Sequence, residues 1–155
     1  MYVFDTGSYS KLKHYYPQVF GSLWRHLGAL AQSGSIVSTR EVRRELGNGS
    51  PVPYVTEWLD ANAQMFTTPS AGELQFVARI LAIPHFQSII GEQQRLTGTP
   101  VADPFVIAAG AVRSFTVVTE EHFKPNSAKI PNVCQHFSVP CINLEQFMAQ
   151  ERLSF

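Results

Sequence analysis

The sequence predicts an α/β fold in which helices cover both faces of a parallel sheet. Short apolar runs typical of buried strands alternate along the chain with longer amphipathic patterns typical of helices. No two strand-like runs are joined by a tight hairpin turn, so neighbouring strands are expected to run parallel. The length of 155 residues suits a single domain, over residues 1–155, with a sizeable core.

Composition narrows the class of protein. Apolar residues make up 45% of the chain and charged residues 15%, which is typical of a globular protein. No apolar run approaches the ~20 residues of a membrane span, and no secretory leader precedes the first strand-like run, so we expect a cytoplasmic protein. The formal net charge of zero means that any nucleic-acid contact must be local. Cys134 and Cys141 are too few for a zinc site, and we expect two reduced, buried thiols.

The first elements are a strand and two helices. Residues 2–4 form a short apolar run that predicts a buried strand ending at Asp5. Residues 6–8 read as a turn, and 11–16 as a short helix. A longer helix is expected from Pro17 to Gly34. Its apolar face repeats at steps of three and four residues and consists of Phe20, Leu23, Trp24, Leu27, Leu30 and Ala31.

The middle of the chain continues the alternation. A second strand is expected over 35–38, and Thr39 is a good N-cap for the helix that follows it. Residues 52–62 predict another short helix, and 65–67 a short edge strand. The spacing of Ser70 and Glu73 is that of a capping box at the start of a further helix.

A helix and a strand follow in the stretch from Val101 to Glu121, after one more expected helix over 87–96. Asp103 and Pro104 open an apolar helix, and the strand expected over 115–118 stops at two adjacent glutamates. Asp103 is suited to capping this helix, and it is equally suited to a role in a site at the sheet edge. Ligands bind beyond the carboxyl ends of strands in open α/β sheets.

The remaining residues predict a loop, two helices and a final strand. A polar loop covers 122–129, and a helix of one or two turns is expected over 130–137. Residues 139–142 predict a strand that Pro140 places at an edge of the sheet. Asn143 is expected to cap a final helix that runs through Met148.

Four acidic positions are candidates for a metal site: Asp5, Glu45, Asp103 and one of the pair Glu120 and Glu121. If they converge, neighbouring carboxylates raise one another's pKa values. A hard divalent cation such as Mg²⁺ or Mn²⁺ would relieve that repulsion and could activate a water for phosphodiester hydrolysis. Simpler interpretations remain open, because the aspartates suit helix caps and the glutamates suit a solvated surface or a polar loop.

Four motifs in order resemble the PIN domain superfamily, which includes many metal-dependent ribonucleases and bacterial toxins of the VapC type. They are the strand and acid at 2–6, the strand–helix element at 37–46, the acid-led helix at 101–109 and the strand ending in Thr-x-acid at 117–121. More narrowly, the whole chain is similar to an uncharacterised prokaryotic PIN-like family. That likeness includes Tyr16-Pro17, Phe20, Trp24 and the segment from Lys129 to Cys134.

The resemblance implies a three-layer fold with strand order 3-2-1-4-5 and acids at the carboxyl edge. It also implies a Mg²⁺- or Mn²⁺-dependent endoribonuclease that acts as the toxin of a toxin–antitoxin pair. RNA, a cognate antitoxin and a second copy of the chain are the expected partners, and no membrane is expected. The implied metal ligands are Asp5, Asp103, Glu45 and Glu121, with Glu120 a close second to Glu121. Candidates for contacting the substrate phosphate are Lys11, Arg40, Arg43, Arg44, Ser8 and Thr119.

The chain departs from the PIN pattern at two positions. Gly7 stands where Asn or Ser is usual, with Ser8 one residue further on, and the fourth acid is Glu where Asp is usual. With the neutral net charge, these departures favour a second reading, a PIN-like fold with little catalysis that binds another protein. A flavodoxin-like phosphate-binding domain is less favoured, because no glycine-rich turn follows any predicted strand.

Overall fold

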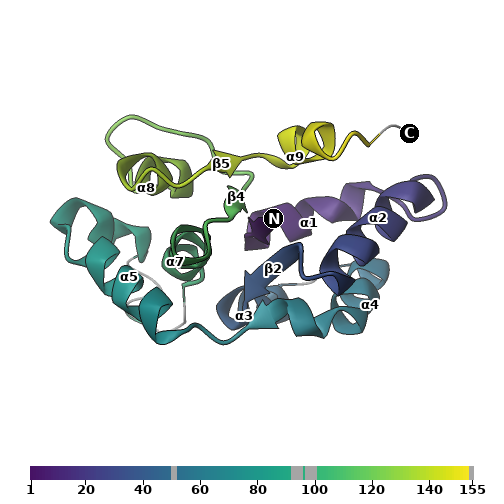
Figure 1. The fold of residues 1–155 in the computed structure, drawn as a ribbon, viewed down its shortest axis with the longest axis horizontal. Helices are drawn as coiled ribbons and strands as arrows, with labels where there is room; N and C mark the ends of the chain where they lie inside the picture. The colour runs from purple at the N-terminus through teal and green to yellow at the C-terminus, as the bar shows by residue number, and fades with distance from the viewer. Residues whose placement is uncertain (50–51, 92–95, 97–100, 154–155) are drawn as a thin grey trace.

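The computed structural model describes residues 1–49, 52–91, 96 and 101–153. Its centre is a five-stranded parallel sheet with the order β3-β2-β1-β4-β5 (Figure 1). The strands are β1 (Tyr2–Phe4), β2 (Ile36–Thr39), β3 (Phe66–Thr67), β4 (Thr116–Val118) and β5 (Cys141–Ile142). The predicted α/β class and the strand order 3-2-1-4-5 are confirmed, as are the edge positions of the third and fifth strands.

Helices surround this sheet. They are α1 (Thr6–Lys11), α2 (Gly21–Gln32), α3 (Arg40–Asn48), α4 (Pro53–Ala61), α5 (Ala71–Leu81), α7 (Asp103–Arg113), α8 (Ile130–His136) and α9 (Leu144–Gln150). Three short 3-10 segments accompany them: η1 (Leu12–His14), η2 (Ala63–Met65) and η3 (Pro84–Ile89). None of the helices in the described part of the chain is both long and apolar enough to cross a membrane.

The two faces of the sheet are covered by different helices. On one face α7 packs against the strands at Gly110, where an added Cβ would come within 2.6 Å of Val117 Cγ2. Glycine is therefore required for this close approach, and α5 packs on α7 from outside (Figure 1). On the other face the Phe147 ring of α9 packs edge-on against the rings of Tyr2 and Phe4, with ring centroids 4.8 and 5.0 Å apart. The three-layer prediction is therefore confirmed.

Several predicted helix signals act as expected. Thr39 caps α3 by accepting a hydrogen bond from Val42 N, and Ser70 and Glu73 form the capping box of α5. Asn143 caps α9. Of the two tryptophans, Trp24 is buried in the core and Trp58 is partly buried against it.

The structure corrects three local predictions, and a fourth lies partly outside the described residues. Residues 6–8 do not form a turn but begin α1, because the Asp5 carboxylate caps this helix. Pro17 precedes α2, which begins only at Gly21. The helix predicted over 87–96 is described only in part: 87–89 belong to η3, Leu96 is helical, and 92–95 lie outside the described residues. Both cysteines are free, but Cys141 is only half-buried.

Candidate active site

The carboxyl ends of β1 and β4 lie side by side and bring distant residues together. These strands are parallel neighbours with Phe4 opposite Val118. The Asp5 backbone N–H continues the pairing by donating to the Val118 carbonyl at 3.1 Å. Asp5 and Thr119 therefore emerge at the same edge of the sheet, where open α/β folds bind ligands.

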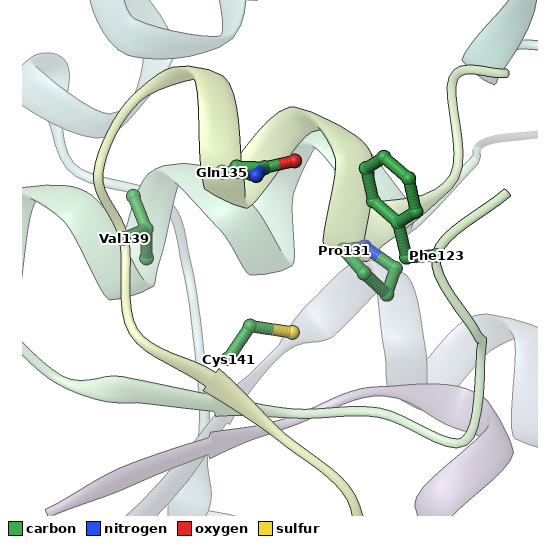
Figure 2. Close-up of a pocket in the computed structure, with 5 residues that line it drawn as sticks. All are labelled: Phe123, Pro131, Gln135, Val139 and Cys141. Carbon is green, nitrogen blue, oxygen red and sulfur yellow. The ribbon is translucent and has the colours of Figure 1, made fainter. Parts of the chain in front are cut away.

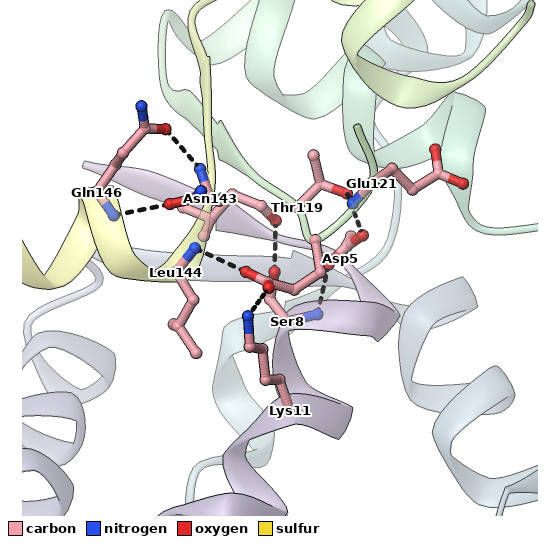
Figure 3. Close-up of polar contacts among 10 residues, drawn as sticks. Asp5, Ser8, Lys11, Thr119, Glu121, Asn143, Leu144 and Gln146 are labelled. Atoms are coloured by element: carbon pink, nitrogen blue, oxygen red, sulfur yellow. Dashed lines mark hydrogen bonds and ion pairs between the residues drawn. The ribbon is translucent and has the colours of Figure 1, made fainter. Parts of the chain in front are cut away.

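Asp5 is held rigidly at this edge. Its side chain is buried, with 4% of its surface exposed. Oδ1 accepts the Ser8 backbone N–H at 2.6 Å, and Oδ2 accepts the Thr119 hydroxyl at 2.6 Å (Figure 3). Burial raises the pKa of Asp5, the hydrogen bonds from Thr119 and Ser8 oppose that rise, and the charge of Glu121 adds to it. Asp5 thus caps α1 and also contributes negative charge to the site.

Gly7 and Ser8 support Asp5 rather than reaching outward. A Cβ added at Gly7 would lie 3.4 Å from Asp5 Oδ2, so glycine keeps the space around this carboxylate open. The Ser8 hydroxyl is buried and donates to the Val118 carbonyl at 3.0 Å. The Thr119 hydroxyl is buried as well and is committed to Asp5. Both predicted phosphate-binding hydroxyls therefore serve to position Asp5.

Asp103 occupies the first helical position of α7 and does not cap it. The N-cap residue is Ala102, and no described residue donates a hydrogen bond to the Asp103 side chain. Burial, followed by the charges of Glu121, Glu45 and Asp5, raises the pKa of Asp103 to about 7. The N-cap interpretation is therefore wrong, and among the described residues three other carboxylates, but no hydrogen-bond donor, act on this side chain.

Glu45 joins three elements around the site. Its Oε1 accepts the Ala102 backbone N–H at 2.9 Å, and its Oε2 accepts the hydroxyl of Thr6. It therefore links the end of α3 to the starts of α7 and α1. A carboxylate late in its own helix opposes that helix dipole, but here it satisfies an amide just before the first turn of α7. Glu45 therefore holds neighbouring elements together and also adds negative charge near Asp103. The solvated-surface interpretation is wrong.

The structure separates Glu120 from Glu121. Glu120 turns toward α9, where its Oε1 accepts the Leu144 backbone N–H at 2.8 Å, and its Oε2 pairs with Lys11. Glu121 lines a cavity together with Asp103, and its charge acts on both Asp5 and Asp103. Its backbone N–H also donates to the Thr119 hydroxyl at 3.1 Å. Glu121 is therefore the fourth member of the acidic group, and Glu120 is an anchor for α9.

Lys129 is a site residue that the sequence analysis did not identify. Its Nζ lies 2.9 Å from Glu121 Oε1, while the Ile130 backbone N–H donates to Glu121 Oε2 at 2.8 Å. A cavity of about 260 Å³ opens beside Asp103, Glu121 and Lys129, and Ser88, Ile89, Ser127 and Ala128 complete its lining. Lys129 follows a long loop after Glu121, so no periodic spacing in the sequence could link the two.

Most of the other predicted cationic side chains have partners away from this cavity. Lys11 pairs with Glu120. The remaining pairs are Arg40 with Glu41 and Arg43 with Asp60. Arg44 is exposed on α3. None of these four lines the cavity beside Asp103 within the described residues, so Lys129 is better placed to meet a substrate phosphate there.

The donor set fits a hard cation with a partly hydrated shell. Within the described ranges, no three Asp, Glu, His or Cys side chains are placed to hold one ion directly. Mg²⁺, however, commonly takes one or two protein carboxylates and keeps several waters. The Asp103 carboxylate is the residue best suited to that role, because it is crowded by negative charge and lacks a donor in the described structure. Asp5 and Glu121 are the neighbours that could share the ion.

Comparison with known proteins gives a family but no activity. No curated protein and no solved structure matches the chain. Residues 2–155 match a family described as a domain of unknown function, DUF4411. That match covers nearly the whole chain, and the protein therefore belongs to the DUF4411 family.

Proposed function

We propose that this protein is a Mg²⁺- or Mn²⁺-dependent endoribonuclease with a PIN-like fold. The observation that carries the proposal is the convergence of four carboxylates at the carboxyl edge of the sheet, with Asp103 half-buried near the other three and its pKa raised to about 7. Such crowding destabilises the ionised site unless a cation is bound. The resemblance to PIN domains supports RNA as the substrate.

Each residue has a distinct role in the proposed reaction. Asp103 and Asp5 would hold the cation, and Glu121 would complete its shell or orient the attacking water. Glu45 fixes the amide before α7 and so fixes the position of Asp103. A bound cation would supply an activated water and stabilise charge on the leaving oxygen. Lys129, which pairs with Glu121, would exchange that partner for a backbone phosphate.

Cleavage of RNA by matched variants tests the proposal. The wild-type chain should cleave single-stranded RNA with Mn²⁺ and lose activity in EDTA. Asp103→Asn should reduce cleavage to background, because the variant keeps the shape of the side chain but not its charge. Asp60→Asn is the matched control, since Asp60 lies on α4, pairs with Arg43 and is exposed. Cleavage that survives EDTA, or that is equal in the two variants, would contradict the proposal.

A toxin role is the finer form of this proposal. In that role the chain would slow growth when expressed alone, and a cognate antitoxin would relieve the effect. Asp103→Asn should remove the growth defect without lowering the amount of protein. Growth inhibition that persists in this variant would rule out a nuclease toxin.

A catalytically inactive protein-binding module is the competing candidate. The formal net charge of zero favours it, because nucleic-acid enzymes usually carry a basic surface. This candidate predicts no thermal stabilisation by millimolar Mn²⁺, whereas a site that binds the ion only in the folded state must raise the melting temperature. The melting scan therefore separates the two proposals without a substrate.

A further inference from the structure

Three cavities lie in a row beside the acidic residues. The cavity next to Asp103 shares Glu121 with a second cavity of about 250 Å³. The second cavity in turn shares Phe123, Pro131 and Cys141 with a third, of about 380 Å³. Because neighbouring cavities share lining residues, they adjoin one another from the carboxylates to the space between α8 and β5, and we call this series of cavities the groove.

The far end of this groove, which we call the Phe123 pocket, has an aromatic wall. Phe123, Pro131, Gln135, Val139 and Cys141 line it. The Phe123 side chain is a large apolar group that remains 55% exposed. Figure 2 shows the Gln135 amide and the Cys141 sulfur directed toward the side of the pocket that Phe123 and Pro131 form. The pocket thus combines an exposed aromatic ring with an amide that can both donate and accept hydrogen bonds.

These features match a nucleobase better than other ligands. Proteins that bind single-stranded nucleic acid stack bases on exposed aromatic rings, and amides read the base edges. The groove also changes character along its length. One end has Lys129 beside the proposed cation site, the middle has His122 and Asn143, and the far end is largely apolar. A ligand that fills it needs an anionic group at one end and a flat ring at the other, as a nucleotide has.

We propose that the Phe123 pocket binds the unpaired base of a nucleotide next to the scissile phosphate. The inference rests on the proposed nuclease function, since it places the phosphate at the carboxylates. A base within a duplex is stacked on its neighbours and cannot enter the pocket without being unpaired. Duplex RNA is therefore a poor ligand and a poor substrate.

Binding without turnover tests the pocket separately from catalysis. Asp103→Asn serves as the background, and the probes are a fluorescent oligouridine, an abasic oligonucleotide of the same length and an RNA duplex. Oligouridine should bind more tightly than either of the other probes. Adding Phe123→Ala should weaken oligouridine binding by about 5- to 150-fold, the range for loss of one stacked base, and leave abasic binding unchanged. Phe123→Tyr should retain tight binding, because it keeps the flat ring.

Controls separate the two proposals. Tyr16→Ala removes another exposed aromatic ring, one that packs beside Tyr54 and lies outside the groove, and it should leave binding unchanged. If Phe123→Ala binds oligouridine as tightly as its parent, the base pocket is wrong, even where the wild-type chain cleaves RNA with Mn²⁺. If Phe123→Ala loses binding selectively but the wild-type chain never cleaves RNA, the pocket stands and the nuclease assignment is wrong.

Discussion

The raised pKa of Asp103 has a measurable consequence for stability. An unfolded aspartate titrates at 3.8, whereas the folded one titrates at about 7. Between these values the folded state holds a proton that the unfolded state has released, so stability falls as pH rises. The full loss of stability is reached once the pH exceeds the pKa of the folded state. A difference of about three pKa units corresponds to ~4 kcal/mol, which is an upper bound for one partly exposed carboxylate.

Asp103→Asn should remove this pH-dependent loss. In EDTA the variant should be more stable than wild type at pH 8, by up to ~4 kcal/mol, and the difference should shrink toward zero near pH 4. Urea denaturation across this range measures it, because a shift in midpoint at constant slope reports stability. Asp60→Asn, at an exposed position, should show no such trend. A wild type that is more stable than Asp103→Asn at pH 8 would refute the argument that the carboxylates crowd one another.

Three further predictions follow from the same geometry. Mn²⁺ at about 100 times its dissociation constant should stabilise the wild-type chain by ~2.7 kcal/mol and leave Asp103→Asn unaffected in thermal unfolding; an equal shift in both would place the ion elsewhere. Glu121→Gln should abolish RNA cleavage, whereas Glu120→Gln should keep it, because Glu120 bonds α9 and Lys11; the reverse order of activities would contradict the assignment. Lys129→Met should tighten Mn²⁺ binding by up to about fivefold, the effect of removing one exposed ion pair, and weaken RNA binding. Calorimetry and fluorescence anisotropy measure these two effects, and looser Mn²⁺ binding would show that Lys129 does not compete with the cation.

Much of the fold could be predicted because its signals are local. The apolar run at 2–4, the Thr39 cap and the box formed by Ser70 and Glu73 each act within a few residues. Alternation of strand and helix then predicted a parallel sheet, and the resemblance to PIN domains implied the strand order. The errors were local too. Asp5 caps α1 and so starts a helix where glycine and serine suggested a turn.

The candidate site was predictable only in part. The positions of Asp5, Glu45 and Asp103 in the sequence make them candidates for the acidic site, but Asp103 is equally suited to capping a helix. Only the folded chain shows that Ala102 takes the cap position, leaving the Asp103 carboxylate without a donor in the described structure. The Phe123 pocket had no sequence signal at all, because its walls come from a loop, α8 and β5.

The sequence by itself determined the alternation of elements, the parallel sheet and the acids that follow its strands, because hydrophobic periodicity and capping depend on neighbours along the chain. The tertiary structure decided which glutamate faces the site, since adjacent residues after β4 diverge toward Leu144 and toward Lys129. It also decided that Lys129 belongs there. The charge around a site residue and its burial depend on which groups lie near it in space. Many of those groups are far away in the sequence, so they come together only when the chain folds.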